Sequence, residues 1–249
     1  APRYVTISEL FRELSDVTLN DAVDSVCRLY AHYVDLLRSA GDAAADELSL
    51  DTFYGWADRI LADFDDVDKN MADASQLFRN LEELNELEST EFLSEAQKEL
   101  IGSFFSNFDP DHKSELRERF RRLWNALLPL YRRLNAELLA EGKAYEGALY
   151  RRVVNALAEE RCALPADVDC YAVVGFNVLD KAEQHLFEIM KKAGKARFYW
   201  DYDSYYADPY KSRGFEAGLF IEENLSNFPN ALPAECFDNF RNIEQIEMV

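Results

Sequence analysis

The chain has 249 residues, 48% of them hydrophobic, and its 47 acidic against 27 basic side chains give a net charge of −20. A chain of this length can bury a large core in one domain or two, and its acidic balance argues against a general coat for nucleic acid. No apolar run approaches the roughly 18 residues of a membrane span, no secretory signal is recognisable, and four scattered cysteines predict reduced thiols in a cytoplasmic protein without a zinc site.

Helical patterns alone fill the first 160 residues. Apolar spacing predicts an amphipathic helix over 21–38. Asp51 or Thr52 is expected to cap a second helix that reaches about Phe64, and a capping-box pattern predicts a third over about 94–105. The inward positions of the first helix are Val23, Val26, Leu29, Tyr30, Tyr33, Val34 and Leu37.

The longest predicted helix covers 114–141, broken or bent near Pro129. Gly142 ends it, and a further helix follows over 145–160. Residues 112–161 hold eleven Lys and Arg against seven Asp and Glu, so this part of an acidic chain is basic.

Four arginines of the longest helix form two pairs, each 11 residues apart. That spacing is about three helical turns, so each pair lies on one face, opposite the apolar stripe. Such a double row can follow the phosphates of a nucleic acid. The alternative is an ordinary solvated face with Glu118 and Glu137 as partners. The four residues are Arg121, Arg122, Arg132 and Arg133.

The pattern changes after Pro165. Short runs over 170–176 and 196–201 have β character, and 180–193 between them predicts a helix with Ala182, Leu186, Phe187 and Met190 inward. A strand–helix–strand unit implies parallel pairing, and a helix is expected again over 214–227. Since two strands are too few for a stable sheet, either the tail adds a strand or a larger sheet is completed elsewhere.

Two acidic motifs offer alternatives in which magnesium supports small-molecule chemistry. The run from Asp63 to Asp68 fails as a calcium loop, because its sixth position is not glycine. As an aspartate cluster for magnesium it is imperfect, and the simpler interpretation is a solvated helix end. Asp201 and Asp203 follow a predicted strand and can both reach a hard cation, although no phosphate-binding GxxxxGK[ST] loop or other catalytic motif accompanies them.

Five short phrases carry a family resemblance. They are Phe53-Tyr-Gly-Trp-Ala, Leu61-Ala-Asp-Phe-Asp-Asp-Val-Asp-Lys, Leu77-Phe-Arg-Asn-Leu, Ala144-Tyr-Glu-Gly and Val174-Gly-Phe-Asn. In order and spacing they resemble AddB-type helicase–nuclease subunits. These large bacterial proteins join a superfamily 1 helicase-like region to a C-terminal PD-(D/E)XK nuclease. The similarity spans nearly the whole chain, which would correspond to an N-terminal internal part of such a protein.

The resemblance implies a mainly α chain with a smaller α/β part. Residues 1–162 would be a helical insertion domain, and 163–249 a strand–helix–strand piece of a P-loop-type parallel sheet with degenerate helicase motifs. The loop 201–206 would stand at the next strand end, which in active helicases senses the nucleotide and touches single-stranded DNA.

The resemblance also locates a degenerate nucleotide motif. In active helicases the corresponding strand ends in Asp-Glu, which hold magnesium and position the attacking water. Here Val174 and Gly175 take those places and Phe176 follows, while Glu183 resembles the glutamate or glutamine found further along in AddB-type subunits. ATP hydrolysis is therefore not expected, and ATP and magnesium would belong to the parent complex.

The resulting hypothesis is a non-catalytic segment of an AddB-like protein that processes double-strand DNA ends in recombinational repair. It would supply a scaffold, contact the partner helicase–nuclease subunit, and contact DNA through the four arginines, with no membrane partner. The alternatives are a magnesium-dependent small-molecule enzyme that uses either acidic motif, or a purely helical interaction module.

Overall fold

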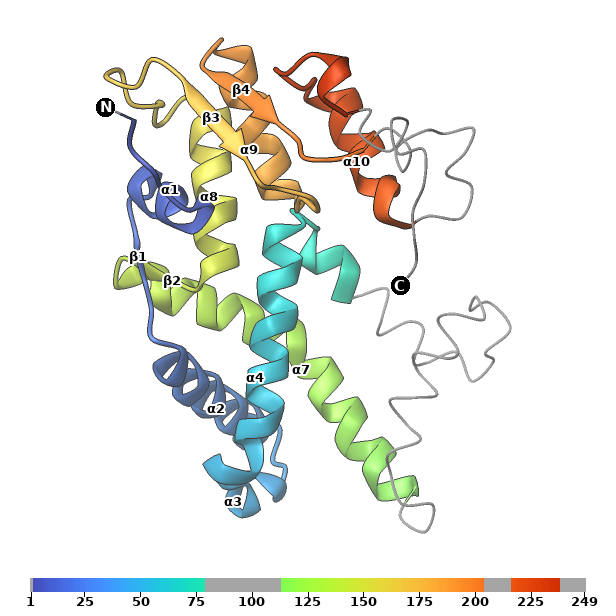
Figure 1. Cartoon of the computed structure of the whole chain (residues 1–249). Coiled ribbons are helices and arrows are strands. Elements are labelled where there is room, and N and C mark those ends of the chain that lie inside the picture. The colour runs from blue at the N-terminus through green and yellow to red at the C-terminus, as the bar shows by residue number, and fades with distance from the viewer. Residues whose placement is uncertain (1, 79–112, 204–215, 238–249) are drawn as a thin grey trace. The chain divides into compact units, whose positions relative to one another are not determined.

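A computed structural model describes residues 2–78, 113–203 and 216–237 (Figure 1). These residues are mainly helical, with two small parallel sheets, which confirms the predicted mainly α chain with a smaller α/β part. The chain divides into two compact units, residues 1–151 and 152–249. The division between these units lies within the helix over 146–158, and the sequence predicts a domain boundary after residue 162.

The first unit is built from helices whose ends follow local capping rules. Thr6 and Glu9 form a reciprocal capping box at the first helix, and Asp21 accepts two backbone N–H bonds at the start of the second. Ser49, rather than the predicted Asp51 or Thr52, caps the fourth helix by accepting from Thr52 N. The helices are α1 (Ile7–Leu14), α2 (Ala22–Ser39), α3 (Ala44–Glu47), α4 (Leu50–Lys69), α7 (Lys113–Ala140) and α8 (Glu146–Ala158).

Three of these helices match the sequence predictions closely, and one is longer. The predicted 21–38, 114–141 and 145–160 are α2, α7 and α8, and Gly142 follows α7 with a left-handed φ of 69°. Helix α4 continues past Phe64 to Lys69. The helix predicted over about 94–105 lies outside the described residues.

The core of the first unit lies between α2, α4 and α7. Phe53 stacks on Tyr33 with ring centroids 5.2 Å apart, and Phe64 meets the edge of Tyr131 at 5.2 Å. Val23 is 56% exposed, so its predicted inward position is wrong; in the first turn of α2 it lies off the packed stripe. The fully buried aliphatic residues include Leu29, Leu130, Leu134 and Leu138.

A two-residue parallel ladder corrects the expectation that the first 160 residues are helical only. Strand β1 (Thr18–Leu19) pairs with β2 (Lys143–Ala144), in the loops before α2 and after α7. Thr18 N donates to the Gly142 carbonyl at 2.9 Å, and Asn20 N donates to the Ala144 carbonyl at 2.8 Å. The ladder therefore ties together two turns that are far apart in sequence.

The second unit contains the predicted strand–helix–strand motif. Strands β3 (Tyr171–Val174) and β4 (Ala196–Tyr199) pair in parallel, and α9 (Lys181–Lys192) connects them in sequence. Helix α10 (Glu216–Asn227) and a short 3₁₀ helix (Ala234–Phe237) follow. The four predicted inward residues of α9 are all buried, as expected: Ala182, Leu186, Phe187 and Met190.

The segment after α10 extends this sheet by one parallel bridge. Asn230 bridges Phe198, and Ala231 N donates to the Phe198 carbonyl at 2.7 Å. Phe228, just before the bridge, packs against Phe198 with centroids 4.9 Å apart, and its carbonyl accepts the indole N–H of Trp200 at 2.7 Å. The tail thus supplies a rudimentary third strand.

No helix within the described ranges is both long enough and apolar enough to cross a lipid bilayer.

Candidate functional site

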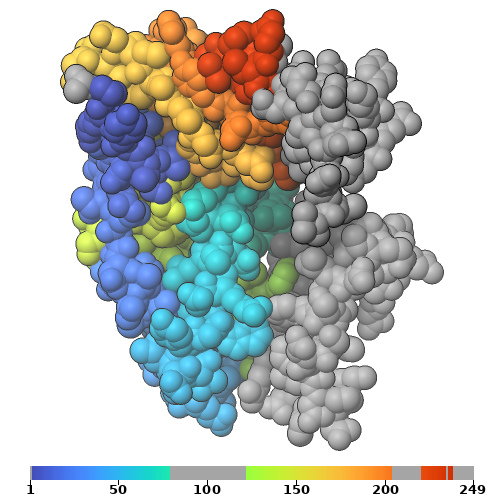
Figure 2. All heavy atoms as spheres, viewed as in Figure 1, coloured from blue at the N-terminus to red at the C-terminus, as the bar shows by residue number. Residues whose placement is uncertain are grey.

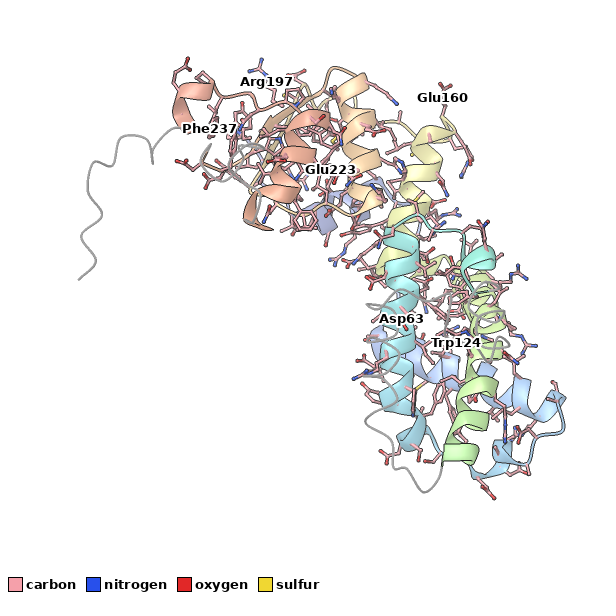
Figure 3. All side chains as sticks on the ribbon, turned by 90° about the vertical axis from the view of Figure 1, so that its right-hand side faces the viewer. Asp63, Trp124, Glu160, Arg197, Glu223 and Phe237 are labelled. Atoms are coloured by element: carbon pink, nitrogen blue, oxygen red, sulfur yellow. The ribbon has the colours of Figure 1, made fainter. Side chains whose placement is uncertain are left out.

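The acidic run of α4 is divided between opposite sides of the helix. Asp63 and Asp66 are exposed, Asp65 is half-buried, and Asp68 is only 1% exposed; Figure 3 labels Asp63 on α4. The interpretation as a solvated helix end is therefore wrong for Asp68. Among the described residues, no group of three or more His, Cys, Asp or Glu side chains is arranged to hold a metal ion.

Asp68 is the centre of a buried polar cluster. The hydroxyl of Tyr131 donates to Asp68 Oδ1 at 2.6 Å, and the hydroxyl of Tyr145 donates to Oδ2. Arg151 Nε lies 2.5 Å from Oδ1 as an ion pair. Asn135 completes the cluster by donating to the Tyr145 hydroxyl at 2.9 Å. The Asp68 carboxylate of α4 is thus joined to Tyr131 of α7, to Tyr145 just before α8 and to Arg151 of α8.

Arg151 also closes the end of α4. Its Nη2 donates to the carbonyls of Val67 and Ala72, each at 2.7 Å. Because the last carbonyls of a helix lack helical partners, a cation there satisfies them and is favoured by the helix dipole. The Arg151 guanidinium therefore pairs with the buried Asp68 carboxylate and also donates hydrogen bonds to the chain at and after the end of α4.

Burial controls the protonation of this cluster. It raises the pKa of Asp68, against the opposing effects of the two tyrosine hydroxyls and Arg151. It also raises the pKa of Tyr131 and Tyr145, and the Asp68 carboxylate raises both further. Both phenols therefore remain proton donors near neutral pH. With Asp68 and Tyr145 almost completely enclosed, the arrangement suits the fixing of helices rather than proton exchange with a substrate.

A second polar cluster joins the same helices at their surface. Lys69 Nζ lies 2.8 Å from both Asp65 Oδ2 and Glu146 Oε2, and Ser8 of α1 donates to Glu146 Oε1 at 3.0 Å. Gly147 N donates to Asp65 Oδ1 at 2.5 Å. A Cβ atom at Gly147 would lie 2.4 Å from the Asp65 backbone oxygen, so only glycine allows α8 to approach α4 this closely.

These two clusters bring together phrases that carry the family resemblance. The phrase beginning at Leu61 supplies Asp65, Asp68 and Lys69, and the phrase beginning at Ala144 supplies Tyr145, Glu146 and Gly147. Sequence reasoning missed their contact, although one signal was present. Asp68 falls four residues after Phe64 and one after Val67, on the apolar side of α4.

One of the four helix arginines is paired with an acid from another element. Arg122 Nη1 forms an ion pair with Asp42 Oδ2 at 2.6 Å, and the side chain of Arg121 lies outside what the structure describes. Glu137, the expected partner of the arginine rows, instead contacts Arg28 and His32 of α2, each at 2.6 Å. The side chain of Glu118 is also outside the described residues.

Arg132 and Arg133 are both exposed. Arg132 donates to Ser75 Oγ at 2.8 Å, which is a neutral partner. Much of the remaining basic surplus is neutralised by nearby acids, because Lys143 contacts Glu141, Arg151 contacts Asp68 and Arg161 contacts Glu159. Among the described arginines of the predicted rows, only this adjacent pair is exposed.

The predicted degenerate motif lies at the end of β3. Val174 is 64% exposed, and Gly175 has a φ of 83°, a left-handed conformation that strains any residue with a side chain. Phe176 turns back onto α9, where its ring meets the edge of Phe187 at 5.3 Å. A carboxylate in place of Gly175 would therefore require a different turn.

Glu183 has a local structural role. Asp180 Oδ1 accepts from Glu183 N at 2.7 Å, and Glu183 Oε2 accepts from Asp180 N at 3.1 Å, which is the reciprocal capping box at the start of α9. The other acids, Asp201 and Asp203, follow β4 after the buried Trp200; Asp201 is exposed and Asp203 is half-buried. These two acids belong to the second unit, and the acidic run of α4 belongs to the first.

Comparison of the chain with protein-family models, curated proteins and solved structures found no match.

Proposed function

We propose that this chain is a non-catalytic segment of an AddB-like helicase–nuclease that processes double-strand DNA ends for recombinational repair. The observation that carries the proposal is the end of β3. Phosphoryl transfer needs acids there, whereas this chain has the exposed Val174, Gly175 at a φ of 83°, and Glu183 engaged in a helix cap. ATP and magnesium would act elsewhere in the parent complex.

In this proposal the second unit is part of a P-loop-type parallel sheet. Two features support it: β3 and β4 are parallel across α9, and the Asn230 bridge repeats the same order after α10. Such successive strand–helix–strand units are the building plan of open α/β sheets.

The first unit would act as a scaffold that presents surfaces to the partner subunit. The buried Asp68 cluster and the close approach at Gly147 support this role, because they fix α4, α7 and α8 to one another without exposing a reactive group. Direct DNA contact, the finer part of the proposal, would fall to Arg132 and Arg133.

The catalytic part is tested by measuring ATP hydrolysis of the purified chain with magnesium and single-stranded DNA. We expect no turnover above that of an Asp201→Asn variant. Turnover by the wild-type chain alone would overturn the assignment of Val174 and Gly175.

DNA contact is tested by fluorescence anisotropy with a duplex that carries a single-stranded end, over a range of salt. Replacing Arg132 and Arg133 by Glu should weaken binding. It should also reduce the slope of log affinity against log salt concentration by the amount expected for about two lost phosphate contacts. The control is Arg3→Glu with Arg38→Glu, which changes the charge equally at two exposed arginines. Equal weakening by both double variants, or no wild-type binding at low salt, would refute the DNA contact.

The family is tested by sequencing the complete gene. We expect a product several times longer, with a GxxxxGK[ST]-like region upstream and a nuclease region downstream.

A further inference from the structure

Strand β3 has one open edge among the described residues. Tyr171 donates its N–H to the Lys195 carbonyl at 2.7 Å on the β4 side, and in a parallel pair successive residues point their backbone groups to alternate sides. The N–H and C=O groups of Ala172 and Val174 are therefore directed to the opposite edge. Within the described ranges, β3 pairs with β4 alone.

That edge lacks the features by which proteins protect exposed strands. Natural edge strands carry lysine, proline or a bulge, whereas no charged residue or proline occurs between Cys170 and Leu179. Val174 is 64% exposed and Val178 is 57% exposed, and in Figure 2 the yellow spheres of this part of the chain belong to the visible surface.

One face of the small sheet is uncovered as well. Val173 and Phe198 are buried toward α9, while Ala172, Val174 and Arg197 on the other face are exposed. Parallel sheets are normally covered on both faces, and two strands with one bridge make an incomplete sheet. Within the described ranges, the sheet thus has an open edge along β3 and exposed side chains on this face.

We propose that the open edge of β3 binds an extended peptide segment as an additional strand, and that it selects an acidic residue beside Ala172. The selectivity comes from Arg197, which is in register with Ala172 on β4 and reaches outward from the sheet in Figure 3. Because Ala172 is small, the guanidinium can extend over it toward the next strand position, roughly 10 Å from β4. A carboxylate there would meet the guanidinium.

A second copy of the chain fits this edge poorly. Two chains that each carry a net charge of −20 repel one another. Antiparallel self-pairing about Val173 would place a valine, not an acid, beside Ala172. The proposal rests on the proposed function only in the source of the segment, which would be the partner subunit. Its test involves neither ATP nor DNA, so the strand-binding proposal and the proposed function can fail separately.

Cys170 allows a direct test, because it is exposed and immediately precedes β3. The chain is equilibrated, under disulfide exchange with excess mercaptoethanol, with two competing probe peptides, Cys-Val-Glu-Val-Val-amide and Cys-Val-Lys-Val-Val-amide. Tethering raises the local concentration of a weakly bound strand. Peptide mapping by mass spectrometry then measures the adducts at Cys170 and at Cys27, an exposed cysteine of α2 that serves as the internal control.

We expect the Glu peptide to exceed the Lys peptide roughly two- to five-fold at Cys170, the ratio of an exposed ion pair, relative to the ratio at Cys27. Arg197→Glu should reverse the preference. Val174→Pro, which removes an N–H on the open edge but none that pairs with β4, should abolish it. Equal ratios at both cysteines, or a preference that survives Arg197→Glu, would overturn the proposal. A dimer in sedimentation experiments that Val174→Pro dissociates would overturn it in favour of self-pairing.

Discussion

Replacing Arg151 by Met should destabilise the first unit by about 3 kcal/mol. The substitution keeps much of the aliphatic length but removes the ion pair to Asp68 and the hydrogen bonds to two carbonyls at the end of α4. Loss of one partner of a buried ion pair costs about 3–5 kcal/mol, because the other charge is left uncompensated. We expect the lower end, since Asp68 keeps two tyrosine donors and burial already raises its pKa.

The assay is urea unfolding followed by far-ultraviolet circular dichroism, which the helices dominate. Arg38→Met is the matched control within the first unit, because its ion pair with Asp46 is exposed on both sides and pairs of that kind contribute about 1 kcal/mol or less. Adding Asp68→Asn to Arg151→Met should restore part of the loss, since a neutral amide needs no counter-charge, its oxygen accepts from one tyrosine hydroxyl and its NH₂ group donates to the other. The reasoning fails if Arg151→Met costs no more than Arg38→Met, or if the double variant is less stable than the single one.

Three other predictions concern stability. Gly147→Ala should cost about 1–3 kcal/mol of stability through its clash with the α4 backbone. The control Gly55→Ala, whose Cβ meets no atom within 4 Å, should be neutral or stabilising. Thermal unfolding compares the two variants, and equal midpoints would contradict the close approach of α8 to α4. Burial raises the pKa of Tyr145, so the stability of the fold should fall as pH rises above about pH 10, where unfolded tyrosines ionise. The fall should be less steep in Tyr145→Phe. Urea midpoints of both proteins from pH 8 to 11 measure the difference, and parallel curves would contradict the prediction. Asp180→Ala should cost about 1 kcal/mol of stability by removing the cap of α9. Glu183→Gln, which preserves a capping box, should change stability little in the same urea assay. A large loss of stability in Glu183→Gln would mean that the charge of Glu183 has another role.

The sequence predicted the helices and strands that depend on short-range patterns. The period of apolar residues located α2, and the alternation from β to helical patterns located β3, α9 and β4, because one buried face imposes its repeat on the sequence. Capping was less predictable: several polar residues precede α4, and Ser49, rather than Asp51 or Thr52, accepts the helical N–H. The reason is that the capping residue is set by the point at which the backbone changes from extended to helical.

The candidate site illustrates a different limit. The double arginine row follows from helical spacing, yet Arg122 pairs with Asp42, a residue 80 positions earlier in the chain. Helical periodicity shows which residues share a face, but not which charges from another element lie opposite that face. Only Arg132 and Arg133 keep the predicted exposed, basic character in the part of the chain that the structure describes.

The sequence by itself determined that this is a mainly helical chain with a small parallel α/β part. The tertiary structure decided what the acidic run of α4 does. Asp68 looks like its neighbours in sequence, but helix packing removes it from water, and a buried carboxylate must then be matched by donors and a cation. Tyr131, Tyr145 and Arg151 supply these from α7 and α8, at separations that no local pattern encodes.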